Sequence, residues 1–137
     1  MIDDIILNKK ESIERCVRQI RLYYVHPSLV SFEDDFFKQD AISLNLQRAA
    51  EQCIDLANHV VKVKKLGLPK ESKDAFILLS QSGLVPVATA QKLTSMVGFR
   101  NILVHEYQKL QVKILKDIIE NHLDDLISFT NDVLEIE

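Results

Sequence analysis

Apolar residues recur along this chain at every third or fourth position, which is the spacing of one face of a helix. The first such segment covers about residues 3–25 and ends at His26 and Pro27, because proline lacks a backbone N–H and disfavours helix in the residue before it. Its expected core positions are Ile5, Ile6, Ile13, Cys16, Val17, Ile20 and Tyr24.

A longer amphipathic segment follows and predicts a second helix that ends near Lys65. Ser31 with Asp34 three positions on resembles a helix start, and Gly67 after a lysine-rich turn is typical of a helix end. The apolar positions expected on its buried side are Ala41, Ile42, Leu46, Ala49, Cys53, Leu56, Ala57 and Val60.

Three further helices are predicted. Ser72 is placed to cap a short third helix that Gly83 stops, and Pro86 begins a fourth that reaches about Glu106. A fifth runs from about Val112 to the C-terminus. Buried positions are expected at Ala75, Phe76, Leu78, Leu79, Val112, Leu115, Ile118, Ile119, Leu126, Phe129 and Val133.

No segment shows the sustained alternation of a strand, and no internal repeat divides the chain. We therefore expect an all-α protein in which residues 1–137 form a single helical domain. Short connections favour an up-and-down antiparallel bundle of four long helices and one short helix. Its helical hairpins offer a surface for a homodimer.

Composition and charge narrow the classes of function. The 137 residues are 47% hydrophobic and carry a net charge of −3, which argues against a non-specific nucleic-acid coat but leaves room for a small RNA site. Without a leader-like or membrane-spanning apolar run, the expected location is the cytoplasm. Cys16 and Cys53 are expected to be reduced core thiols.

The segment from Arg100 to Tyr107 is the part of the chain that indicates chemistry. Leu93, Met96, Val97, Arg100 and Val104 share one arc of the fourth helix, so the arginine is expected among buried side chains. An unpaired buried guanidinium costs on the order of several kcal/mol, because it cannot lose its charge. Arg100 therefore requires an anion.

Helical geometry constrains how these side chains meet. Five positions along a helix rotate a side chain by about 140° and raise it by about 7.5 Å, so Arg100 and His105 do not share a face. Either the helix unwinds near His105, or the arginine stem wraps toward the histidine. Asn101 and His105, four apart, do share a face.

The three side chains together suit a phosphodiester. Histidine can take or give a proton near neutral pH, arginine offers a fixed fork to phosphate oxygens, and Asn101 can orient either group. With RNA the 2′-hydroxyl is the nucleophile, so no metal is required. The alternative is a structural Arg–carboxylate pair, with Glu51 or Asp55 as the partner of Arg100 and His105 as a satisfied residue near a helix end.

Other side chains give no competing site. His26, His59 and His122 are too dispersed for zinc, and Glu120, His122, Asp124 and Asp125 are expected to form a solvated face. With three scattered glycines the chain has no phosphate-binding loop, and it lacks the Gly-Ser and paired-Asp pattern of a nucleotidyltransferase catalytic subunit. No cofactor, metal, DNA or membrane partner is expected.

The motif Arg100-Asn101-x-x-x-His105-x-Tyr107 resembles the Arg-x4-His-x-Tyr signature of HEPN-domain toxins of the HepT type. The likeness extends over essentially the whole chain. Its further segments are Asn45 to Glu51, Ile54 to His59, Leu66 to Pro69 with Ser72, Asp74, Phe76 and Leu79, and Ser95 to Phe99.

This resemblance implies an all-helical homodimer with Arg and His of both subunits near the two-fold axis, acting as a metal-independent endoribonuclease toxin. In this interpretation His105 is the general acid/base, Arg100 stabilises the transition state and Asn101 assists. It also implies a partner, a minimal nucleotidyltransferase antitoxin of the MntA type, that attaches AMP to Tyr107. Two alternatives stay open: a non-catalytic substrate- or nucleotide-binding subunit of a two-component nucleotidyltransferase, and a purely structural helical dimer.

Overall fold

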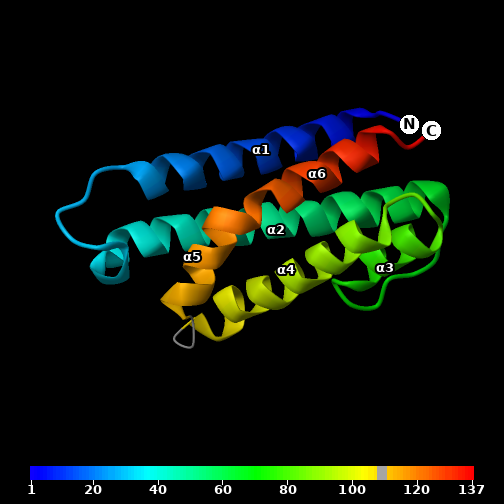
Figure 1. Cartoon of the computed structure of the whole chain (residues 1–137). Helices are drawn as coiled ribbons and strands as arrows, with labels where there is room; N and C mark the ends of the chain where they lie inside the picture. Colours follow the sequence, from blue (N-terminus) through cyan, green and yellow to red (C-terminus); the bar gives the residue numbers. More distant parts are fainter. Residues whose placement is uncertain (108–110) are drawn as a thin grey trace.

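The computed structural model describes residues 1–107 and 111–137, in which every regular element is helical (Figure 1). Two long helices come first, followed by a short one and three of intermediate length. The elements are α1 (Asp4–Val25), the 3-10 turn η1 (Phe32–Asp34), α2 (Phe36–Lys64), α3 (Asp74–Gln81), α4 (Val87–His105), α5 (Val112–Asn121) and α6 (Leu123–Leu134).

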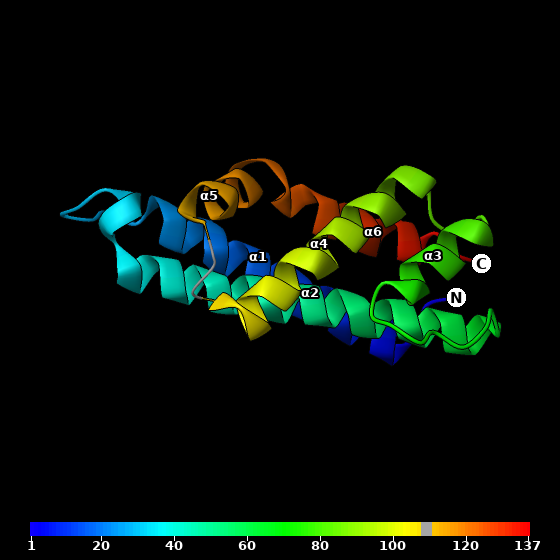
Figure 2. The same ribbon diagram turned by 90° about the horizontal axis from the view of Figure 1, so that it is seen from below.

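The long helices α1 and α2 run antiparallel side by side, and the later helices cover them (Figures 1 and 2). α6 packs along α1 and α2, so the two ends of the chain lie together, and the Met1 ammonium donates to the carbonyl of Ile136 at 2.6 Å. α4 crosses α2 obliquely and brings the motif segment toward the end of the bundle where α2 begins. The all-α expectation is confirmed.

Carboxylate caps start the two long helices. The side chain of Asp3 accepts from the backbone N–H of Ile6 at 2.8 Å, and Asp35 accepts from that of Lys38 at 3.0 Å. The second helix was expected to start at Ser31, but Ser31 caps only η1, without a side-chain bond to its backbone. α2 starts later because the Asp35 carboxylate reaches the free N–H groups of its first turn.

The third helix also starts later than the sequence suggested. Ser72 was expected to cap it, yet α3 begins at Asp74, and no side chain caps its N-terminus. The Asp74 carboxylate instead accepts from the backbone N–H groups of Lys70 and Glu71, at 3.0 and 2.9 Å, and so fixes the turn that leads into the helix.

The expected fifth helix is two helices. The chain leaves helical geometry at His122, where φ is −126° and ψ is 0°, so α5 and α6 meet at a bend. The His122 ring contacts Asp117 at 3.3 Å and Asp125 at 3.2 Å, one carboxylate from each helix. The prediction of four long helices and one short helix is therefore wrong for the described residues.

The buried positions largely follow the apolar pattern. Phe76 and Phe129 are almost fully buried and pack edge to face with ring centroids 5.3 Å apart, which joins α3 to α6. Two expected core residues are exposed: Ile5 at 48% and Val104 at 40%. Val104 lies in the last turn of α4, where the adjacent Leu103 is buried, so only one side of this turn is covered.

Both cysteines are buried and free, as expected, and burial raises the pKa of each thiol. Within residues 1–107 and 111–137, no helix combines the length and apolar character needed to cross a membrane.

Candidate functional site

Arg100 reaches from α4 to α2, where it meets Glu51. Its Nε lies 3.5 Å from Oε1 of Glu51, an ion-pair distance without the alignment of a hydrogen bond, and this nitrogen is buried. Its Nη1 donates to Oδ1 of Asn101 at 2.9 Å. The side chain as a whole remains 24% exposed, so the guanidinium is oriented by the protein and still in partial contact with solvent.

Glu51, and not Asp55, is the acidic partner of Arg100. Asp55 pairs with Lys9 at 3.4 Å, whereas Gln47 donates from Nε2 to Oε1 of Glu51 at 3.2 Å and holds that carboxylate toward α4. The anion that Arg100 requires is thus supplied within the chain. This is one half of the structural alternative, the Arg–carboxylate pair.

The structural alternative also required a hydrogen-bonded His105, and the structure does not show one among the residues that it describes. His105 is the last residue of α4, its side chain is exposed, and no hydrogen bond or ion pair joins it to the part of the chain that the structure describes. The helix does not unwind before it, because Glu106 N–H still donates to the Ile102 carbonyl at 2.9 Å. Arg100 and His105 therefore leave the helix in different directions, and Asn101, bonded to Arg100, lies on the His105 face.

Tyr107 lies just beyond α4 and contacts the start of α2. Its hydroxyl donates a hydrogen bond to Oδ1 of Asp40. Partial burial, and next the Asp40 carboxylate, raise the pKa of Tyr107 above its ordinary value of 10. Ser43 has a smaller opposite effect on that pKa, although its buried Oγ makes no well-aligned hydrogen bond. A hollow of about 200 Å³ opens beside the phenol, between α2 and Leu103.

Three polar residues of α2 line this hollow and were not singled out from the sequence as site residues: Asp40, Ser43 and Gln47. Asp40, Ser43, Gln47 and Glu51 are spaced at i, i+3, i+7 and i+11, so they form one polar strip along the helix. The strip contacts Tyr107 at one end and Arg100 at the other. The sequence does contain a sign of this strip, because its polar residues recur at helical spacing along α2 in the same way as the apolar core residues.

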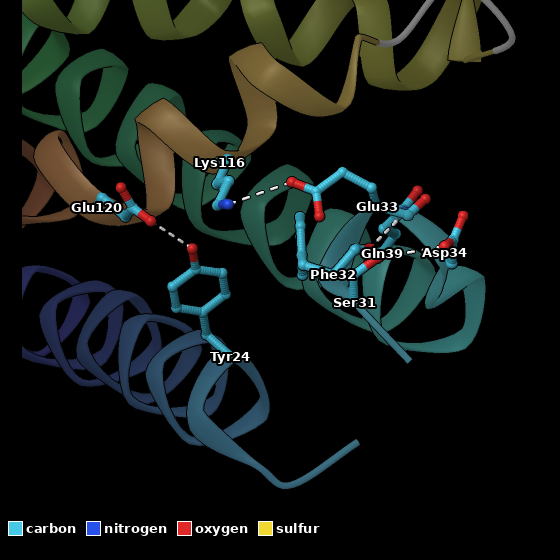
Figure 3. Close-up of polar contacts among 8 residues, drawn as sticks. All are labelled: Tyr24, Ser31, Phe32, Glu33, Asp34, Gln39, Lys116 and Glu120. Atoms are coloured by element: carbon cyan, nitrogen blue, oxygen red, sulfur yellow. Dashed lines mark hydrogen bonds and ion pairs between the residues drawn. The ribbon is translucent and has the colours of Figure 1, made fainter. Parts of the chain in front are cut away.

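A second group of polar contacts lies where α5 meets α1 and η1 (Figure 3). Tyr24 donates to Glu120 at 2.5 Å, and Lys116 pairs with Glu33 at 3.2 Å. Gln39 donates to the carbonyl oxygens of Phe32 and Glu33. Burial and the Glu120 carboxylate raise the pKa of Tyr24 to about 12. These contacts fasten helices together.

The expectation of a solvated acidic face is wrong for one residue. The Asp125 side chain is only 17% exposed and pairs with Lys92 of α4 at 3.6 Å as well as with His122. Asp124, 87% exposed, fits the expectation and pairs with Arg21. His26 and His59 lie elsewhere, and His59 bonds Asp3 at 2.7 Å.

Comparison with known proteins assigns the chain to a protein family. The sequence profile of the family described as Ribonuclease HepT-like matches residues 13–133. The chain belongs to this family. The mRNA nuclease HepT of Shewanella oneidensis is 43% identical over 136 residues, which cover 99% of this chain and 100% of that protein.

Solved structures agree with the family. The tri-AMPylated HEPN toxin of S. oneidensis, in complex with an MNT antitoxin, superposes with a TM-score of 0.91 at 41% identity, covering 97% of this chain and 98% of that one. A toxin–antitoxin structure with AMP-PNP gives a TM-score of 0.90 at 41% identity, with coverages of 96% and 98%. The cytosolic protein YutE of Bacillus subtilis shares the fold at 16% identity, with a TM-score of 0.74 and coverages of 93% and 86%.

Proposed function

We propose that this HepT-like protein is a metal-independent endoribonuclease toxin, neutralised by a minimal nucleotidyltransferase antitoxin. The observation that carries the proposal is the contrast between Arg100 and His105: the guanidinium is oriented by Glu51 and Asn101, while the imidazole is left without a partner in the described chain. A purely structural arginine would not need an unengaged histidine one turn and a half further on. The S. oneidensis relative, named an mRNA nuclease over its full length, supports the same function.

The chemistry follows from the donors available. The 2′-hydroxyl of RNA attacks the adjacent phosphorus, a bond to O2′ forms, and the bond to O5′ breaks. The products are a 2′,3′-cyclic phosphate and a free 5′-hydroxyl. His105 transfers the proton, and Arg100 stabilises the additional charge on the phosphoryl oxygens. Asn101 orients the guanidinium through the hydrogen bond that it accepts from Nη1.

A homodimer completes the site in this proposal. Because α4 stays helical through His105, the two key side chains diverge within one protomer, and in a dimer the arginine of one copy is completed by the histidine of the other. Val104 supports this arrangement, since it lies beside His105 and is 40% exposed although apolar.

Tyr107 is the proposed site of control. The related S. oneidensis toxin is AMPylated in complex with its antitoxin, and the motif tyrosine of this chain is 39% exposed at the same end of α4 as His105. An adenylyl group there would place a fixed negative charge where an RNA phosphate has to enter. With such a substrate and partner, we expect the protein to act in the cytoplasm. The full-length similarity to a protein named an mRNA nuclease favours this function over a non-catalytic binding subunit.

Expression of the chain without its antitoxin tests the proposal. We expect growth arrest by the wild-type protein and normal growth with His105→Ala. His26→Ala is a matched control, because it removes another exposed histidine, which follows α1 and lies outside the motif of α4, and it should remain toxic. Equal growth of cells expressing the wild-type protein and His105→Ala, at equal protein levels, would refute the toxin function.

A further inference from the structure

The phenol of Tyr107 has a carboxylate neighbour to which the proposed function gives no role. Asp40 lies in the second turn of α2 and accepts the hydrogen bond of the Tyr107 hydroxyl. Asp40 is exposed, and no lysine or arginine of the described chain pairs with it. The contact therefore joins a base that water can reach to the one hydroxyl proposed to react.

Transfer of AMP to a phenol needs such a base. As the phenolic oxygen attacks the α-phosphorus of ATP, the new P–O bond forms, the bond to pyrophosphate breaks, and the phenolic proton must leave. Little phenolate exists beforehand at neutral pH, because burial and Asp40 raise the pKa of Tyr107 above 10. Removal of the proton during attack is then the available route, and a positioned general base typically contributes about 10²- to 10⁴-fold.

We propose that Asp40 is the general base for AMP transfer to Tyr107. It accepts the phenolic proton as the oxygen attacks and then releases it to water. The inference rests on the proposed function, since it concerns the same tyrosine as the AMP acceptor. The toxin would in this way supply a catalytic group for its own inactivation.

The hollow beside the phenol is consistent with this role. It is lined by Asp40 as well as by Tyr107, so it gives an incoming phosphate access to the phenol next to the carboxylate that accepts its hydrogen bond. Ser43 lines it with an Oγ that is buried and has no hydrogen-bond partner in the described residues, and Gln47 follows one turn later. Both can donate to phosphate oxygens.

Two substitutions separate a base from a hydrogen-bond acceptor. Asp40→Asn keeps the size and an acceptor oxygen but cannot take the proton, whereas Asp40→Ala removes both. Asp55→Asn is the matched control, since it makes the same change on the same helix at a carboxylate that contacts only Lys9 in the described chain. Each full-length variant is incubated with ATP and saturating partner nucleotidyltransferase, and AMP transfer is followed by intact mass. RNA cleavage without the antitoxin is measured in parallel to show that each variant is folded.

We expect Asp40→Asn and Asp40→Ala to slow AMP transfer alike, by about 100-fold or more, with Asp55→Asn unaffected. The deficit of Asp40→Asn should shrink by about tenfold per pH unit between pH 7 and 9, relative to Asp55→Asn, because phenolate then forms without a base.

Transfer by Asp40→Asn at the control rate would overturn the inference, as would a deficit that does not change with pH. Failure of Asp40→Asn to bind the antitoxin would also overturn it, since Asp40 would then act in docking. A wild-type protein that gains no AMP, or gains it equally with Tyr107→Phe, would instead refute the proposed regulation itself.

Discussion

Complementation between two inactive variants is the sharpest consequence of the geometry of α4. Arg100 and His105 diverge by about 140° along a helix that remains regular between them. If the active cleft takes its arginine from one protomer and its histidine from the other, Arg100→Ala and His105→Ala are each inactive alone. A heterodimer of the two then holds one cleft with both wild-type side chains and one cleft with neither.

The expected magnitude follows from counting clefts. A purified heterodimer should show about half of the wild-type activity, and a random equimolar mixture about a quarter, because half of its dimers are mixed. Two different affinity tags allow the heterodimer to be purified from co-expressed chains, and cleavage of a labelled RNA gives the rate.

The reciprocal pairing provides the control. A heterodimer of the wild-type chain with the Arg100→Ala, His105→Ala double variant should be inactive, because neither of its clefts is complete. Should this heterodimer retain about half of the activity while the complementing pair has none, each protomer would hold its own site and the shared cleft would be refuted.

Three further predictions concern single residues. Glu51→Gln should lower kcat by about fivefold with little change in KM, since a partly exposed ion pair contributes at most about 1 kcal/mol to the orientation of Arg100. A change in KM alone would contradict this. Phe129→Ala should reduce the free energy of unfolding by about 3–5 kcal/mol in urea titrations, because the ring is fully buried, and a loss below about 1 kcal/mol would show that the core can close around it. The backbone N–H of Lys38 lowers the pKa of Asp35 below 3.8, so this cap stabilises the fold at neutral pH and its contribution is lost as the pH falls through the lowered pKa. Asp35→Ala should therefore lower the melting temperature at pH 7 but not at pH 2, and equal losses at both would contradict the assignment.

The helices could be predicted from the sequence because burial alone sets their periodicity. The start of α2 could not, since Ser31 and Asp35 are both competent caps, and only the folded turn decides which of them reaches the backbone of α2. The break at His122 has no glycine or proline to mark it. Asp124 and Asp125 are its local sign, since acidic residues favour the first turn of a helix.

The motif residues could be identified from the sequence, but the residues that contact them could not. Arg100 was recognised as a cation in need of an anion, and Glu51 and Asp55 were equally placed candidates one turn apart. The crossing of α4 over α2 directs Glu51 to the guanidinium and leaves Asp55 to Lys9. The contact of Asp40 with Tyr107 could not be predicted either, because the partner of a polar residue on an amphipathic helix depends on which helix packs against it.

Cleavage of RNA by the purified protein tests the central claim most directly. Wild-type protein, free of antitoxin and in excess EDTA, should convert a single-stranded RNA into fragments ending in 2′,3′-cyclic phosphate, and His105→Ala should lose this activity while keeping the wild-type melting temperature. Cleavage by His105→Ala at the wild-type rate, or products that require added divalent metal, would contradict the assignment of His105 and Arg100 as the catalytic pair.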